Sequence, residues 1–230
     1  PLYTSNPERV NTGIAGLDDM IEKGFWGGST TLLAGPTGSG KTIIGLHFIR
    51  EGAVNNEPGV YVGFQENPVQ LSRVMRNFDW DPEALLKSEA FELMYRSPVE
   101  MQLDSVAAEL LNRVREGRVK RVVIDAIGDL KKSCADPQRF SDFVYSLTQW
   151  FATKNVTCLL LYELHHLFDV PQISDEEISN MSDNIVLLNF TRGTEMARRV
   201  RVIKTRGSAH DHREHALQIS DSGISIREIS

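Results

Sequence analysis

Short apolar runs alternate along the chain with segments whose apolar residues recur at helical spacing. The runs lack period-two alternation, which is typical of strands that are covered on both faces of a sheet. Those predicted as strands are 30–34 (TTLLA), 60–64 (VYVGF), 91–95 (FELMY), 122–126 (VVIDA) and 157–162 (TCLLLY). Strands that alternate with helices predict a mostly parallel sheet with helices on both sides, which binds ligands beyond the carboxyl ends of its strands.

The segments between these strands carry apolar stripes along one side of a helix. From Leu103 to Val114 the apolar residues recur at i, i+3, i+4, i+7, i+8 and i+11, and a second stripe extends from Phe140 to Phe151. This periodicity predicts amphipathic helices that pack on the sheet. A further helix, KTIIGLHFI, is expected to begin at Lys41.

The last third of the chain has a different pattern. The strand-like segments there are 184–190, 197–206, 216–220 and 224–229, and between them lie the dipeptides Arg192-Gly193, Arg206-Gly207 and Ser222-Gly223. Such dipeptides are suited to turns, so we expect antiparallel hairpins that extend the sheet.

Composition narrows the class of protein. The 230 residues are 41% apolar and 24% charged, and 25 Lys+Arg against 31 Asp+Glu give a net charge of −6. Such a field disfavours a polyanionic partner unless a local basic patch exists. Cys134 and Cys158 have no nearby cysteine, so we expect a reducing, cytoplasmic setting without a disulfide framework. The longest apolar run, CLLLY, is too short to span a membrane.

Residues 1–12 carry neither a basic start nor an apolar stretch, so they do not form a signal peptide. We expect them to be a linker that follows an upstream domain. Residues 13–230 are then expected to form one folded domain.

The strongest motif is GPTGSGKT at residues 35–42, which follows a predicted strand and opens a predicted helix. Glycines let consecutive backbone N–H groups surround an anion, and the helix amino terminus adds partial positive charge. This is the phosphate-binding loop (P-loop) of nucleoside triphosphatases, so we expect a nucleoside triphosphate and Mg²⁺ as ligands. The residues expected to bind ATP are Gly35, Thr37, Gly38, Ser39, Gly40, Lys41 and Thr42.

Asp125 closes the apolar strand RVVID. A carboxylate at that position is costly unless it has a partner. Beside a P-loop, Asp125 is expected to hold Mg²⁺ through water, while the Thr42 hydroxyl ligates the ion. The alternative is a strand-end Asp that caps the next element.

Three further segments carry a resemblance to a known family: 9–18 (RVNTGIAGLD), 59–66 (GVYVGFQE) and 204–211 (KTRGSAHD). They resemble KaiC-type ATPases of the RecA superfamily, over nearly the whole chain from Arg9 to Ile226. The resemblance implies a RecA-like P-loop NTPase fold. It is closest to the C-terminal ATPase and autokinase domain of KaiC, because 178–183 (ISNMSD) parallels the phosphorylated segment of that domain.

The resemblance implies that nucleotide lies between neighbouring subunits of a hexameric ring, in a clock-like or signalling system. Lys204 and Arg206 match cations that reach the phosphates held by the next subunit, and Ser208 and His210 match its nucleotide contacts. Independently, side chains two residues apart on a strand leave the same face. Two cations there could neutralise charge that develops on a transferred phosphoryl group.

Two positions depart from the family pattern. Members typically carry two adjacent acids where this chain has Gln65-Glu66. Gln65 can orient water but cannot accept a proton, and Glu66, as its neighbour, is expected to point the other way. Slow turnover is therefore expected if the first position is the base. In the phosphorylated segment, Ser179 is the candidate acceptor, but Asn180 replaces the neighbouring threonine. The acidic residues 175–177 would repel a phosphate on Ser179.

Other functions compete with this one. A nucleotide-gated ring that recruits partners but barely hydrolyses ATP would also fit the glutamine. A RecA-like DNA-binding protein would need basic loops, yet residues 163–183 contain six acids and no Lys or Arg. Lys131 and Lys132 are too few to reverse this, so no nucleic-acid partner is expected.

Two side-chain clusters have alternative interpretations. The arginines at 198, 199 and 201 are interpreted as a solvated face. The histidines at 165, 166, 210, 212 and 215 resemble zinc ligands but lack supporting cysteines, so a metal role is not expected.

Overall fold

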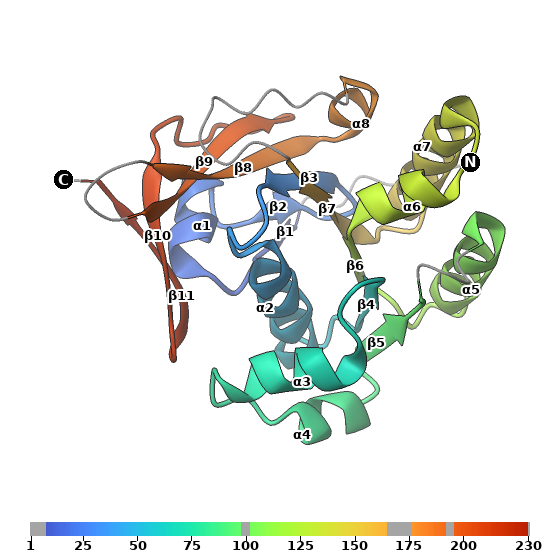
Figure 1. The fold of residues 1–230 in the computed structure, drawn as a ribbon, viewed down its shortest axis with the longest axis horizontal. Helices are drawn as coiled ribbons and strands as arrows, with labels where there is room; N and C mark the ends of the chain where they lie inside the picture. Colours follow the sequence, from blue (N-terminus) through green and yellow to red (C-terminus); the bar gives the residue numbers. More distant parts are fainter. Residues whose placement is uncertain (1–7, 98–101, 165–175, 192–195, 230) are drawn as a thin grey trace.

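The computed structural model describes residues 8–97, 102–164, 176–191 and 196–229. Its centre is a nine-stranded sheet with the order β11-β10-β9-β8-β3-β7-β6-β4-β5 (Figure 1). The strands are β3 (Thr30–Gly35), β4 (Gly59–Gly63), β5 (Phe91–Tyr95), β6 (Arg121–Asp125), β7 (Thr157–Glu163), β8 (Asn184–Thr191), β9 (Ala197–Thr205), β10 (His215–Ser220) and β11 (Gly223–Glu228).

Strand direction divides the sheet into two parts. From β8 to β5 every pairing is parallel. From β8 to β11 every pairing is antiparallel. The expected mostly parallel sheet with antiparallel hairpins at its carboxyl-terminal side is thus confirmed.

Helices cover both faces of the sheet, as Figure 1 shows. One side carries α1 (Ala15–Met20), α2 (Lys41–Val54), α3 (Pro68–Arg76) and α4 (Pro82–Lys87). The other side carries α5 (Leu103–Arg115), α6 (Ile127–Ser133), α7 (Pro137–Thr153) and α8 (Glu176–Met181). Alternation of side chains along β3 separates the two cores, since Leu33 belongs to the core that includes α2, whereas Leu32 and Ala34 belong to the core on the other face.

Three helices begin at the same local signal, an Asn or Asp followed by Pro. The side chains of Asn67, Asp81 and Asp136 accept hydrogen bonds from the first-turn N–H groups of α3, α4 and α7. The proline that follows each of them needs no hydrogen-bond partner at the first helical position. This signal explains why α3 and α4 form although the apolar periodicity did not predict them.

Packing extends upstream of the domain boundary expected at residue 13. Strand β1 (Arg9–Val10) pairs with β2 (Phe25–Trp26), and Val10 is buried. The buried Arg121 guanidinium donates to the backbone oxygens of Asn11 and Phe48 at 2.8 and 2.9 Å. Residues 8–12 are therefore held against the domain. The remainder of the expected linker, residues 1–7, lies outside the described residues.

Among the described helices, none combines the length and apolar character required to cross a bilayer.

One buried histidine links this packing to pH. His47 on α2 is 8% exposed and lies edge-on to Trp80, with ring centroids 4.7 Å apart. Its Nε2 atom has no hydrogen-bond partner among the described residues. Burial, followed by the nearby Arg50, lowers the pKa of His47 to about 4 from the usual 6.5. The native state therefore holds the ring neutral under conditions in which the unfolded chain protonates it.

We predict that His47→Leu flattens the acid side of the stability profile. Between pH 6.5 and about 4 the unfolded chain binds a proton that the native state does not, so stability falls as pH falls. The shift of 6.5 − 4 = 2.5 units corresponds to a loss on the order of 3 kcal/mol. Urea unfolding at pH 7 and pH 4.5 should show a smaller difference in His47→Leu than in the wild type. The matched control is His212→Asn at an exposed position, and equal acid sensitivity of wild type and His47→Leu would contradict the prediction.

Candidate active site

The P-loop connects β3 to α2 at the carboxyl edge of the parallel strands. Gly38 and Gly40 have φ of 74° and 107°, in the left-handed region that glycine adopts without steric cost. Gly40 is the N-cap of α2, and its carbonyl accepts from the N–H of Ile44 at 3.0 Å. Ser39 is fully buried beneath the loop, whereas Thr37 and Gly38 are exposed. The loop thus presents its outer backbone and the helix amino terminus to an anion.

Lys41, the first residue of α2, lies within this loop. Its Nζ donates to the backbone oxygens of Gly35 and Pro36, both at 2.8 Å, and the residue is 8% exposed. Burial lowers the pKa of Lys41, and the nearby Glu163, Asp125 and Glu66 oppose that shift. A buried cation whose hydrogen bonds go to backbone carbonyls is well suited to an anionic ligand.

Asp125 ends β6 and is joined to the P-loop helix. Its Oδ2 atom accepts from the Thr42 hydroxyl at 2.8 Å and from the Tyr61 hydroxyl. Burial raises the pKa of Asp125, although the hydrogen bonds from Tyr61 and Thr42 favour its ionised form. The structure therefore brings Thr42 and Asp125 together, as the sequence predicted.

These two oxygens fit a divalent cation. Mg²⁺ takes oxygen ligands in near-ideal octahedral geometry at about 2.1 Å, so adjacent ligands are about 3 Å apart. The Thr42 Oγ1 and Asp125 Oδ2 atoms lie 2.8 Å apart. In the structure this contact is a hydrogen bond, and its length is close to the spacing that two neighbouring Mg²⁺ ligands would have.

Gln65 and Glu66 follow β4 at the same edge, and their side chains have different surroundings. The exposed Gln65 donates from Nε2 to Asp129 Oδ2 at 2.8 Å. Glu66 is half-buried, and burial, with Asp125 second, raises the pKa of its carboxyl. A carboxylate with a raised pKa beside a phosphate site is the stronger proton acceptor of the two residues.

Lys204 and Arg206 lie at the amino ends of the parallel strands, which we call the amino edge, opposite to the carboxyl edge that carries the P-loop. Lys204 Nζ donates to the backbone oxygen of Ser182 at 2.7 Å and to that of Ser179 at 3.4 Å. Arg206 follows the end of β9, with its guanidinium 3.3 Å from the Asp183 carboxylate. The two cations were expected to leave the same face of one strand, but β9 ends at Thr205, one residue before Arg206, so strand alternation does not apply to this pair.

Strand register explains why Lys204 and Arg206 lie far from the P-loop of the same chain. Lys204 pairs with Ile185, which in turn pairs with Leu32 near the start of β3. The P-loop begins at Gly35, three residues or about 10 Å further along the strand at 3.3 Å per residue. The two cations therefore lie at the edge that faces away from their own P-loop.

Ser208 and His210 lie beside this second cluster. Ser208 Oγ accepts from Arg9, and Thr205 Oγ1 donates to the Ser208 backbone oxygen at 2.8 Å. Since the Thr205 proton is used there, the 2.8 Å contact with His210 Nδ1 requires the histidine to donate. Its Nε2 is left as a buried acceptor without a partner among the described residues. Burial, and then His212, lower the pKa of His210.

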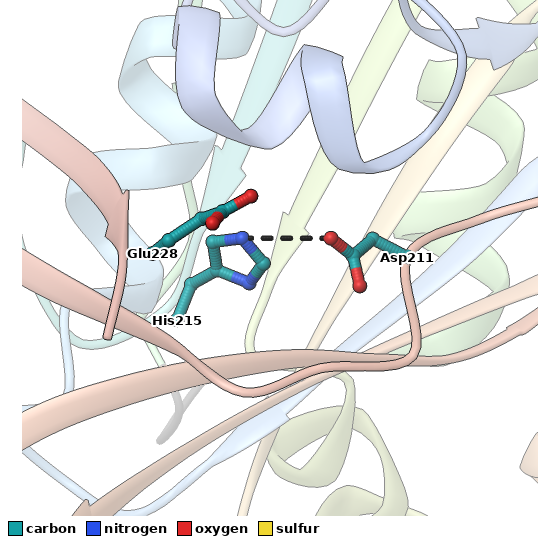
Figure 2. Close-up of side chains that lie close together, drawn as sticks. All are labelled: Asp211, His215 and Glu228. Carbon is teal, nitrogen blue, oxygen red and sulfur yellow. Dashed lines mark ion pairs between the residues drawn. The ribbon is translucent and has the colours of Figure 1, made fainter. Parts of the chain in front are cut away.

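The histidines considered as metal ligands divide into separate groups. Figure 2 shows His215 with Asp211 and Glu228, where His215 Nε2 is 3.7 Å from the Asp211 carboxylate. The Arg213 guanidinium lies 2.6 Å from Asp211 and 2.8 Å from Glu228. Because this guanidinium forms ion pairs with both carboxylates, the group is an ion-pair network that ties the segment before β10 to β11. His165 and His166 lie outside the described residues.

Two residues that sequence reasoning missed join the site. Tyr61 is fully buried in β4, and a buried hydroxyl in an apolar strand needs a partner, which here is Asp125. Arg198 was interpreted as part of a solvated face, but its Nε donates to the backbone oxygen of Gly38 at 3.0 Å. Arg198 thus places a cation against the exposed tip of the P-loop in the same chain.

Of the remaining predicted segments, the structure describes Ser179 but not residues 165–175. Ser179 is half-buried on α8, and its backbone oxygen contacts Lys204. Residues 165–175, which carry part of the acidic loop that argues against DNA, lie outside the described residues.

Comparisons with known proteins agree with this architecture. The family model described as "ATPase: KaiC" matches residues 10–230. The circadian clock oscillator protein KaiC of Synechococcus elongatus is 28% identical over 226 residues, which cover 97% of this chain but 43% of that protein. The chain therefore spans less than half the length of such relatives, equivalent to one KaiC domain.

Two relatives have about the same length as this chain. The UPF0273 protein of Thermotoga maritima is 31% identical, with 95% of this chain and 96% of that protein covered. The crystal structure of the KaiC-like protein PH0186 from Pyrococcus horikoshii superposes with a TM-score of 0.83 at 28% identity, covering 95% of this chain and 98% of that one. The expected RecA-like fold of the KaiC type is thus confirmed, whereas the choice of the C-terminal KaiC domain stays a prediction.

The Tyr61–Asp125 pair yields a prediction about stability. Tyr61→Phe removes a donor to a buried carboxylate, so we expect the free energy of unfolding to fall by about 1–3 kcal/mol at pH 7.5. The loss of the donor raises the pKa of Asp125 further, and the penalty applies only to the ionised form. It should therefore shrink as the pH is lowered through the titration of Asp125.

Urea unfolding at several pH values measures this effect. Tyr145→Phe, at a tyrosine that is 54% exposed, is the matched control and should be neutral. A Tyr61→Phe penalty that is absent at pH 7.5, or that grows on acidification, would contradict the account.

Proposed function

The chain belongs to the KaiC ATPase family, and we propose that it binds MgATP at the boundary between two copies of itself and hydrolyses it there. The observation that carries this proposal is the placement of the P-loop and of Lys204 with Arg206 on opposite edges of one sheet. Because the chain spans 43% of the clock relatives, this activity is proposed for the domain by itself.

The carboxyl edge supplies one half of the site. The P-loop N–H groups and Lys41 would bind the phosphates, and Thr42 and Asp125 would hold Mg²⁺. When bound, the ion would neutralise charge on the terminal phosphates. Tyr61 supports Asp125 from within the core, and Arg198 adds a cation at the loop tip.

The amino edge would supply the other half to a neighbouring copy. Lys204 and Arg206 lie at the edge away from their own P-loop, where they contact the backbone oxygen of Ser182 and the carboxylate of Asp183. In a head-to-tail ring each copy presents one edge to the next, so every boundary receives both halves. A hexameric ring is the closed form that we propose, and Ser208 and His210 are proposed to approach the nucleotide from this second edge.

The chemistry that we propose is transfer of the terminal phosphoryl group to water. A bond forms between the water oxygen and the terminal phosphorus, the bond to the oxygen of the leaving ADP breaks, and the water proton passes to the Glu66 carboxylate. Glu66 suits this role because its pKa is raised from the usual value. Lys204 and Arg206 of the neighbouring copy would neutralise the charge that develops.

A second acceptor, the Ser179 hydroxyl, is proposed for the same phosphoryl group. Ser179 lies on the amino edge beside Lys204, so a ring would bring it toward the nucleotide of the neighbouring copy. The serine oxygen would take the place of water, with its proton passing to the same carboxylate. Such a modification suits the clock or signalling role that we propose from the KaiC relatives.

One observation favours a slower alternative. Gln65 cannot accept a proton. If Glu66 does not substitute for an acid at that position, the ring would bind ATP and recruit protein partners with little turnover. Neither version requires nucleic acid or a membrane.

Mixing two inactive variants tests the shared site. Lys41→Ala removes phosphate binding, and Arg206→Ala removes the trans cation, so each alone should release little phosphate from ATP. In rings assembled at random from equal amounts, about a quarter of the boundaries combine an intact P-loop with an intact Arg206. Steady-state phosphate release by the mixture should therefore approach a quarter of the wild-type rate.

The control replaces the Arg206→Ala partner with the Lys41→Ala/Arg206→Ala double variant, which should restore nothing. A mixture that is no more active than the sum of its components would place Arg206 with its own P-loop and contradict the shared site.

Intact-mass spectrometry tests the serine acceptor. After incubation with MgATP, the wild type should gain the mass of one phosphate, and Ser179→Ala should gain none because the acceptor hydroxyl is missing. Ser182→Ala, three residues away, should still be modified. A wild type that stays unmodified after long incubation would limit the reaction to water as the acceptor.

A further inference from the structure

A buried carboxylate, Asp129, lies beside the candidate site without a place in the chemistry above. It is in the first turn of α6 and is 7% exposed. Its Oδ2 atom accepts from Gln65 Nε2 at 2.8 Å, while Oδ1 is 3.2 Å from the largely exposed Lys132 ammonium. Asp129 thus connects α6 to the residue at which the chain departs from the acidic pair of its family.

The chemistry of this contact fixes the orientation of the glutamine side chain. A carboxylate can only accept hydrogen bonds, so the NH₂ end of the Gln65 carboxamide must face Asp129. The carbonyl oxygen of the same planar group then points away from Asp129. Gln65 is exposed, and the solvent therefore has access to it. A hydrogen bond to a charged partner is roughly twice as strong as a neutral one, which favours a single rotamer.

The position of the pair relates it to the phosphates. Gln65 and Asp129 line a cavity of about 340 Å³ together with Glu163. Glu163 ends β7 and pairs with Gly35, the first residue of the P-loop. The cavity therefore lies at the carboxyl edge of the strands, the edge at which the P-loop begins.

We propose that Asp129 is a positioning residue that holds the Gln65 carboxamide so that its carbonyl oxygen orients the attacking water. This inference rests on the proposed hydrolysis. A fixed glutamine can align a water without taking its proton, as in other P-loop enzymes. Gln65 would then orient the nucleophile, and Glu66 would accept its proton. A single acidic base would perform both tasks.

Truncation of Asp129 tests the orientation. Asp129→Ala should lower kcat for ATP by between about tenfold and a hundredfold, because misplacement of a reacting group by about 1 Å can cost about a hundredfold. The KM for ATP should stay within about twofold, since the phosphate contacts are untouched. Asp129→Asn keeps an acceptor oxygen and should retain more activity than Asp129→Ala. The matched control, Lys132→Ala, removes only the exposed ion pair and should leave kcat unchanged.

An exchange of the two groups provides the sharper test. Gln65→Glu alone places two carboxylates in contact, so one must hold a proton, and kcat should fall as pH rises and that proton is lost. Adding Asp129→Asn restores an amide-to-carboxylate hydrogen bond with its direction reversed. The double variant should lose this pH dependence and recover kcat relative to Gln65→Glu at high pH.

A measurement without nucleotide tests the contact directly. The side-chain NH₂ resonances of Gln65, identified by their loss in Gln65→Ala, should shift in Asp129→Ala and stay in place in Lys132→Ala. Unshifted resonances, or an Asp129→Ala kcat within about twofold of the wild type, would overturn the proposal. If instead the wild type releases no phosphate that depends on Lys41, the proposed hydrolysis fails together with the role that depends on it.

Discussion

The pairing of β3 between β7 and β8 is the constraint on which both halves of the site depend. Parallel pairing with β7 aligns the ends of the strands, so that the P-loop, Asp125 and Glu66 share one edge. The next strand, β9, runs antiparallel to β8 and returns the chain to the other edge, where Lys204 lies opposite Ile185. This one reversal of strand direction therefore separates the edge that carries the P-loop from the edge that carries Lys204 and Arg206.

The carboxyl edge concentrates charges that are only partly compensated. Burial disfavours the ionised forms of Lys41, Asp125 and Glu66. It lowers the pKa of Lys41 and raises the pKa values of Asp125 and Glu66. Hydrogen bonds from Tyr61 and Thr42 to Asp125, and from Gln65 to Asp129, limit the cost. Such a cluster destabilises the folded state relative to an apolar core. Its arrangement suits a ligand that brings both phosphates and a divalent cation.

Local patterns predicted much of this structure, whereas contacts set by tertiary register were not accessible from the sequence. The P-loop and Asp125 could be predicted because the motif GPTGSGKT and the apolar strands that precede both are visible in adjacent residues. Tyr61, Asp129 and Arg198 could not, since each acts through a partner far along the chain. The helices α3 and α4 were missed because their Asn-Pro and Asp-Pro starts are local signals that apolar periodicity does not contain.

The most direct test of the shared site is a structure of the protein with Mg²⁺ and a non-hydrolysable ATP analogue. The account predicts that Lys41 and the P-loop of one copy hold the terminal phosphate while Lys204 and Arg206 of another copy approach it, with Mg²⁺ near Thr42 and Asp125. A nucleotide bound wholly within one copy, with Arg206 still against Asp183 and distant from every phosphate, would contradict it.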